Sequence, residues 1–146
     1  MKHDLEPRRR QIGVGLQDRV YRAVVVDDEF SHRRILVQIL LSTGFQVAAE
    51  GVNGEDAVQL MAENEPDLLV LDYHMPRKNG LEALLEIRQS DAKTPILMCT
   101  TENERDKVLE LLQAGLTEYI VKPIDRKIVL EKLEKMFPPP PPAFSG

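Results

Sequence analysis

Charged and hydroxyl side chains follow four apolar runs of this chain, at the point where each run ends. Asp27 and Asp28 come directly after the first of these runs, and Asp72 ends the next. Thr100 closes the third run, and Lys122 follows the last. If the runs are parallel strands, their carboxyl ends meet at one edge of a sheet, where ligands bind in open α/β folds. The sequence therefore predicts a cluster of three carboxylates, a hydroxyl and an ammonium group.

This set of groups suits phosphoryl transfer to a carboxylate. A carboxylate can attack a phosphorylated donor and become an acyl phosphate, but both partners are anionic and repel each other. Mg²⁺ relieves that repulsion, and it prefers carboxylate oxygens, phosphate oxygens and water as ligands. We therefore expect Asp27 and Asp28 to bind Mg²⁺ (or Mn²⁺) beside Asp72, with Thr100 and Lys122 placed to contact the transferred group. Without metal, the clustered carboxylates should raise at least one pKa.

The segments that must position these groups alternate between strand-like and helix-like patterns. Strands are expected at Val20–Val26, Phe45–Ala49, Asp67–Leu71, Pro95–Cys99 and Thr117–Val121. Helices are expected between the N-cap Ser31 and Gly44, at Glu55–Asn64, Gly80–Gln89 and Glu104–Gln113, and after the cap Asp125. Five strand–helix pairs indicate an α/β fold, a doubly wound five-stranded parallel sheet with helices on both faces. The most apolar run, Asp67–Leu71, is expected at the centre.

Size and composition fit one domain between two tails. The chain has 146 residues, of which 42% are hydrophobic, and a net charge of −5, so bulk affinity for DNA is not expected. No apolar run approaches the ~20 residues of a membrane span, and the single cysteine, Cys99, fits a reducing, cytoplasmic setting. We expect a flexible extension at residues 1–19, the body at 20–137 and a proline-rich tail at 138–146.

Taken together, the motifs resemble the response-regulator receiver domain. The resemblance covers about residues 20–137 and rests on four segments in order: Val25–Glu29, Leu71–Pro76, Met98–Thr100 and Tyr119–Pro123. Gly80 and the Ala114-Gly115 pair also fit. The resemblance implies a flavodoxin-like (βα)5 sheet with strand order 2-1-3-4-5. Within the family, the chain is most similar to stand-alone regulators of the chemotaxis type.

The resemblance implies how the acidic residues work. Asp72 would accept the phosphoryl group from a histidine kinase or a histidine phosphotransfer protein. Asp27, Asp28 and Asp72 would hold the magnesium ion together with the backbone carbonyl of His74. The protein would not be an enzyme in the usual sense, because its chemistry would be limited to self-phosphorylation from small donors and self-dephosphorylation.

The resemblance also implies a switch. Thr100 and Lys122 would contact the phosphoryl group, and Tyr119 would rotate inward as Thr100 moves. The face of the fourth helix, fifth strand and fifth helix would then bind a protein target, for example at the flagellar motor. Neither DNA binding nor membrane insertion is expected. The protein would be a monomer, with dimerisation on phosphorylation as an open alternative.

Several alternatives stay open at this point. The chain could be a receiver fragment of a larger regulator, or an intermediate in a phosphorelay. An aspartyl-phosphate hydrolase of the haloacid-dehalogenase kind also uses a strand-end aspartate and magnesium, but it needs a second acid where this chain has His74. A dinucleotide site is disfavoured, because Gly13-Val14-Gly15 lacks the third glycine and precedes the first strand.

Other notable residues have simpler interpretations. The side chain of His74 is expected to line the pocket entrance, and Cys99 to be a small buried strand residue. Arg8–Arg10 is expected in a disordered arm, and the proline run in a linker stub or an inert tail. Thr101 departs from the family pattern, in which this position is small. We expect its side chain to hinder in-line access to phosphorylated Asp72 and so to slow the loss of phosphate.

Overall fold

A computed structural model describes residues 11–101 and 103–140. Its strands are β1 (Arg22–Val26), β2 (Gln46–Gly51), β3 (Leu68–Asp72), β4 (Ile96–Thr100) and β5 (Glu118–Val121). Its α-helices are α1 (Phe30–Ser42), α2 (Gly54–Asn64), α3 (Gly80–Ser90), α4 (Arg105–Gln113) and α5 (Arg126–Met136). The strands form one parallel sheet in the order β2-β1-β3-β4-β5. The predicted doubly wound, flavodoxin-like fold and its strand order are confirmed, with β3 at the centre.

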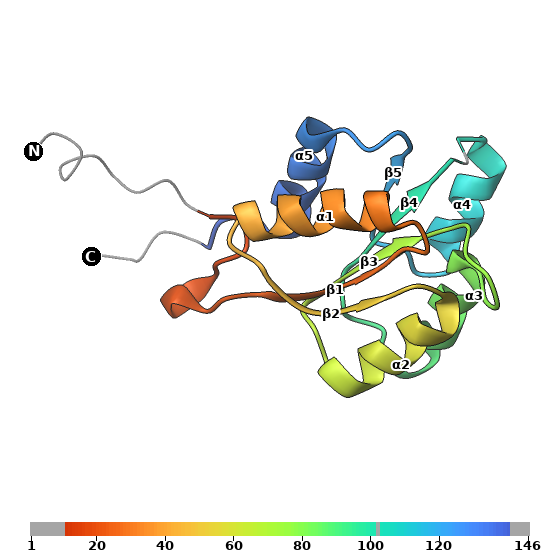
Figure 1. Ribbon diagram of the computed structural model, residues 1–146, viewed down its shortest axis with the longest axis horizontal. Helices are drawn as coiled ribbons and strands as arrows, with labels where there is room; N and C mark the ends of the chain where they lie inside the picture. Colours follow the sequence, from red (N-terminus) through yellow and green to blue (C-terminus); the bar gives the residue numbers. More distant parts are fainter. Residues whose placement is uncertain (1–10, 102, 141–146) are drawn as a thin grey trace, which may run out of the picture.

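Helices cover both faces of this sheet: α1 and α5 lie on one face, and α2, α3 and α4 on the other (Figure 1). Alternate strand residues enter the two layers. Val25 packs with Leu36 and Leu133 under α1 and α5, whereas Val24 packs with Ala83 on the opposite side. Because both faces are covered, β3 and β4 are buried along their whole length, as is typical of parallel sheets.

Most element ends follow the signals in the sequence. The side chain of Asp125 caps α5, and Gly44, with φ of 94°, lies just past the end of α1. Strand bounds differ from the predicted ones by one or two residues. The predicted N-cap Ser31 was wrong: Glu29 occupies the N-cap position of α1 without a side-chain capping bond, and the Ser31 hydroxyl donates to its carboxylate at 3.1 Å. The helix begins early because the N–H of Glu29 donates to Oδ1 of Asp27 at 2.9 Å, which turns the chain there.

Ile12 and Gly13 pack against the body and Arg19 pairs with Asp67, which contradicts the predicted flexible extension for residues 11–19, although residues 16–19 are exposed. Ile12 is buried in the core beneath α1 and α5. The N–H of Gly13 donates to the carbonyl of Thr43 at 2.8 Å. A Cβ at Gly13 would lie 2.2 Å from the backbone nitrogen of Phe45, so no larger residue fits. Residues 1–10, including the predicted arginine-rich arm, lie outside the described residues, as do residues 141–146 of the tail.

An aromatic cluster closes the same end of the sheet. The ring of Tyr21 lies 6.2 Å from that of Phe45 and 5.0 Å from that of Phe137, measured between centroids. Phe45 and Phe137 meet edge to face at 5.3 Å. The packed N-terminal segment and the end of α5 therefore share one apolar cap at the amino ends of the strands.

Candidate functional site

The predicted site residues gather at the carboxyl edge of the sheet. Val26 of β1 pairs with Leu71 of β3, so the residues that follow them, Asp27 and Asp72, lie side by side. Thr100 is the last residue of β4, and its carbonyl accepts a hydrogen bond of 2.8 Å from the N–H of Lys122. The strand register therefore brings together residues that lie up to 95 positions apart in the chain.

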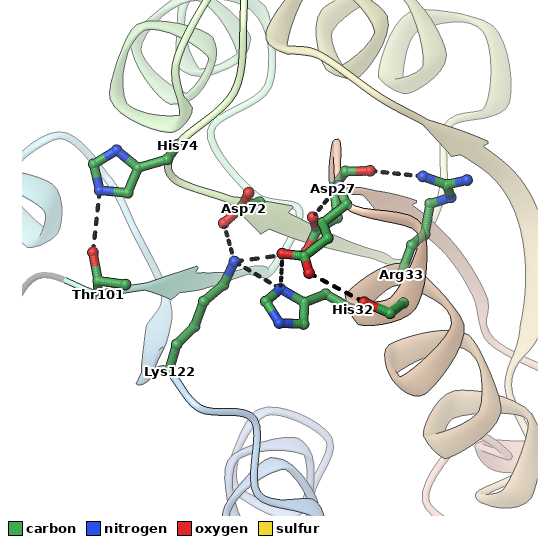
Figure 2. Close-up of polar contacts among 9 residues, drawn as sticks. Asp27, His32, Arg33, Asp72, His74, Thr101 and Lys122 are labelled. Atoms are coloured by element: carbon green, nitrogen blue, oxygen red, sulfur yellow. Dashed lines mark hydrogen bonds and ion pairs between the residues drawn. The ribbon is translucent and has the colours of Figure 1, made fainter.

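Lys122 is the ammonium group at the centre of this cluster. Its Nζ lies 2.8 Å from Oδ1 of Asp72 and 3.9 Å from Oδ2 of Asp27. Figure 2 shows the three side chains converging. Asp27 is fully buried and Asp72 is 2% exposed. One partly buried ammonium therefore faces two buried carboxylates.

The electrostatics reflect that shortage of positive charge. Burial raises the pKa of Asp72 to about 6, the hydrogen bond to Lys122 opposes the rise, and the charge of Asp27 adds to it. Burial also raises the pKa of Asp27, although the N–H of Glu29 and the charge of Lys122 work against it. The predicted rise in pKa from the clustered carboxylates is present at Asp72, but desolvation is the larger cause. In both cases burial disfavours the charged carboxylate, so ionisation of either group costs stability.

A divalent cation would supply the missing charge, and the donor atoms fit one. Oxygens of Asp27, Asp28 and Asp72 lie within 4.8 Å of one another. Oδ2 of Asp27 is buried and has no hydrogen bond within residues 11–101 and 103–140. Asp28 is exposed and opens the cluster to solvent. Hard oxygen donors with one open side match the coordination that Mg²⁺ prefers.

The loop after β3 folds back under Asp72. The N–H of Gly80 donates to the carbonyl of Tyr73 at 2.7 Å. A Cβ at Gly80 would lie 2.8 Å from the carbonyl oxygen of Asp72, so glycine allows this close return. The loop thereby fixes the backbone around Asp72 and carries His74 to the mouth of the site.

His74 and Thr101 meet at that mouth. Nε2 of His74 lies 3.2 Å from Oγ1 of Thr101, and both side chains are exposed. In Figure 2 the pair lies beyond Asp72 from Asp27. The exposed side chain of His74 therefore has Thr101 as a hydrogen-bonding partner beside the acidic cluster.

Thr100, Tyr119 and Cys99 are the remaining residues that the sequence analysis singled out near this edge. Thr100 is fully buried. Tyr119, in β5, is half-buried against the α2–α4 layer, and Nζ of Lys132 lies 5.4 Å from its ring centroid. Cys99 is fully buried, and burial raises the pKa of its thiol to about 12, which confirms it as a core residue.

Sequence reasoning missed one group in this site, the imidazole of His32. Its Nδ1 lies 3.2 Å from Nζ of Lys122 and 3.1 Å from Oε2 of Glu29. Periodicity gave no signal for it, because Asp28 precedes α1 and the direction in which the first turn of α1 faces Lys122 depends on the tertiary fold.

Comparisons with known proteins agree with this geometry. The model of the family described as "Response regulator receiver domain" matches residues 23–134. The chain is 40% identical over 115 residues to "Chemotaxis protein CheY" of Bacillus subtilis, covering 79% of this chain and 96% of that protein. It is 36% identical, with the same coverage, to the protein of that name from Thermotoga maritima.

Solved structures give the same result. The crystal structure of the CheX-CheY-BeF3-Mg+2 complex from Borrelia burgdorferi matches with a TM-score of 0.85 and 27% identity, covering 88% of this chain and 98% of that one. The response regulator domain of Thermotoga maritima CheB matches with a TM-score of 0.74 and 32% identity, covering 84% and 100%. None of the helices formed by residues 11–101 and 103–140 has the length and apolarity needed to cross a bilayer.

Proposed function

The chain belongs to the response-regulator receiver family, and we propose that Asp72 is the residue through which it is switched. Members of this family are phosphorylation-activated switches of two-component signalling. The observation that carries the assignment is the pairing of two buried carboxylates, Asp72 and Asp27, with one ammonium, Lys122, at 2.8 and 3.9 Å. We assign the switch to residues 20–137 together with the packed segment 11–19.

The proposed reaction transfers a phosphoryl group from a phosphohistidine or a small donor. A carboxylate oxygen of Asp72 attacks phosphorus, the bond to the donor breaks, and the donor keeps that electron pair and takes up a proton. Asp27, Asp28, Asp72 and the backbone carbonyl of His74 would hold Mg²⁺, which neutralises charge when bound. Above pH 6, Asp72 is mostly ionised and ready to attack.

Lys122 and Thr100 respond to the new group. Phosphorylation places about −1.5 to −2 charges beyond the carboxylate, and the ammonium of Lys122 is the nearest positive charge. The hydroxyl of Thr100 would hydrogen-bond a phosphoryl oxygen. Tyr119 would then rotate inward and leave its contact with Lys132.

The output of this switch is proposed to be binding of a protein. Four exposed apolar side chains lie on α4, β5 and α5: Leu109, Leu112, Val121 and Ile128. Relatives named for chemotaxis, and a related CheY structure in complex with CheX, support a chemotaxis-type partner as the target. The phosphodonor would be a histidine kinase or a histidine phosphotransfer protein, in a reducing cytoplasm that suits Cys99.

Phosphorylation with acetyl phosphate tests the reaction. We expect a stoichiometric adduct that needs Mg²⁺, survives acid and is lost in base. Peptide mapping should place it on Asp72. Steady release of phosphate far beyond one equivalent would instead favour a hydrolase, and an adduct that forms equally in excess EDTA would contradict the proposed metal site.

Capture of partners tests the output. Protein loaded with beryllofluoride and Mg²⁺ should retain a target that the unloaded protein does not. A flagellar-motor component would establish chemotaxis, whereas a histidine phosphotransfer protein would establish a relay. Equal capture by both forms would contradict a phosphorylation-controlled output.

A further inference from the structure

His32 contacts the phosphorylation site and the first turn of α1 through one nitrogen. Its Nδ1 lies 3.2 Å from Nζ of Lys122 and 3.1 Å from Oε2 of Glu29. The His32 side chain is 29% exposed, and that of Lys122 is 14% exposed. Figure 2 shows the imidazole beside the ammonium. A residue of α1 thus touches the lysine that pairs with Asp72.

The two contacts of Nδ1 exclude each other. An ammonium group donates hydrogen bonds and accepts none, so the contact with Lys122 requires a bare Nδ1 that accepts. A carboxylate only accepts, so the contact with Glu29 requires a proton on the same nitrogen. His32 therefore has two hydrogen-bonded states, one for each partner.

We propose that His32 is a positioning residue that holds Lys122 in the unphosphorylated protein and releases it to the phosphoryl group, when Glu29 takes over Nδ1. This inference rests on the proposed phosphorylation of Asp72. It gives Lys122 a second partner besides Asp72. It also provides a way for phosphorylation of Asp72 to change the hydrogen bonds of α1.

The charges favour the Lys122-bound state at rest. Burial lowers the pKa of Lys122, but the hydrogen bond to Asp72 and the negative charges of Asp72 and Asp27 together outweigh burial and raise it. The amine is therefore a charged donor, and Nδ1 of His32 must accept. Glu29 is held ready as the alternative partner, because the hydroxyl of Ser31 donates to its other oxygen, Oε1, at 3.1 Å.

Phosphorylation would reverse this preference. The negative charge of Asp72 moves outward onto the phosphoryl oxygens, and the ammonium of Lys122 follows it. Its hydrogen bond to Nδ1 of His32 is weaker than its bond to Asp72, because the latter is made to a carboxylate. Once Lys122 leaves, the imidazole changes tautomer and Nδ1 donates to Glu29.

Nitrogen NMR of the ¹⁵N-labelled imidazole tests this in the parent protein. We expect a bare Nδ1 in the free protein and a protonated Nδ1 after addition of beryllofluoride and Mg²⁺. An identical His32 spectrum in both forms, with loading verified from backbone shifts around Asp72, would overturn the inference alone. A protein that does not load at all would overturn the proposed function and this inference with it.

Two variants of His32 separate hydrogen bonding from shape. In His32→Asn, the amide oxygen takes about the place of Nδ1 and can accept from Lys122, whereas His32→Leu cannot. Because the resting hydrogen bond competes with loading, His32→Leu should bind beryllofluoride about fivefold more tightly than the parent, which is ~1 kcal/mol. His32→Asn should stay within twofold of the parent. Unchanged or weaker binding by His32→Leu would overturn the inference.

Discussion

An aspartate lies at each end of strand β3, and the two carboxylates differ in burial and in their charged partners. Asp67, just before the strand, accepts hydrogen bonds from the guanidinium of Arg19 at 2.5 Å and from the N–H of Arg22 at 2.8 Å. Asp72, the last residue of the strand, is buried beside Asp27 and shares a single ammonium with it. These two aspartates are only five residues apart. The carboxylate at the amino edge has its hydrogen-bonding partners, whereas the one at the carboxyl edge has too little positive charge near it.

The contrast shows how the molecule separates stability from function. At the amino edge, aromatic rings and the packed segment 11–19 close the core, and the carboxylate there is paired. At the carboxyl edge, two buried carboxylates face a single lysine, and we propose that a cation and a phosphoryl group bind there. Strain at a functional site must be offset elsewhere in the fold, and this fold has its stabilising cap at the opposite end.

Removal of a ring from the amino edge should have the largest effect. Phe45 is 3% exposed, so Phe45→Ala is expected to lower the free energy of unfolding by ~3–4 kcal/mol, from the lost burial and the cavity. Urea denaturation measures this. The exposed neighbour Gln46→Ala should change it by less than ~0.5 kcal/mol. At urea concentrations below its unfolding midpoint, the Phe45→Ala protein should still be phosphorylated. If the folded variant were not phosphorylated, the two edges of the sheet would not be independent.

An Asp→Asn substitution should change the free energy of unfolding in opposite directions at the two edges of the sheet. Asp27→Asn keeps the acceptor for the N–H of Glu29 but removes a buried charge, so at pH 7.5 without Mg²⁺ it should stabilise the protein by ~1 kcal/mol. Asp67→Asn weakens the pair with Arg19 and should destabilise it. Stability changes of the same sign in both variants would remove the contrast between the edges.

The gain from Asp27→Asn should depend on pH. Raised pKa values mean that folded Asp27 and Asp72 hold protons that the unfolded chain, with its ordinary value of 3.8, has already released. The parent protein therefore loses stability as pH rises from about 4 through about 6, and regains it as pH falls. The advantage of Asp27→Asn should accordingly shrink between pH 7.5 and pH 4.5. An advantage that grows toward low pH would contradict the raised pKa values.

Magnesium should stabilise the parent by binding to the folded state alone. At ten times its dissociation constant, the gain is expected to be ~1.4 kcal/mol. Asp27→Asn should show little gain at the same concentration, whereas Asp67→Asn should respond like the parent. Thermal melts with Mg²⁺ and with EDTA measure both. Equal gains in the parent and in Asp27→Asn would place the ion elsewhere.

The smallest expected effect concerns the mouth of the site. Thr101→Ala removes both bulk and the contact with His74, so its phosphorylated form should lose phosphate about threefold faster, less than ~1 kcal/mol in barrier height. Thr101→Ser keeps the hydroxyl and should lie closer to the parent. Decay rates measured after removal of the donor decide this, and equal rates for Thr101→Ala and the parent would dismiss the hypothesis.

Much of the carboxyl edge was predictable from sequence, and the amino edge was not. Apolar runs that end in polar residues such as Asp72 or Lys122 indicate a parallel sheet, because the carboxyl ends of parallel strands all lie at the same edge. His32 was missed because its contact depends on how the first turn of α1 faces β5, which periodicity alone does not fix. The packing of Ile12 was missed because a short apolar segment among charges resembles a tail until a tertiary partner is known.

Phosphorylation of matched variants is the most direct test of the central claim. Parent, Asp67→Asn and Asp72→Asn proteins would be incubated with acetyl phosphate, with Mg²⁺ or with EDTA, and the adduct quantified by intact mass. The parent and Asp67→Asn should form it only with Mg²⁺, and Asp72→Asn should not form it at all. An adduct on Asp72→Asn as abundant as on the parent would contradict the assignment of the phosphorylation site.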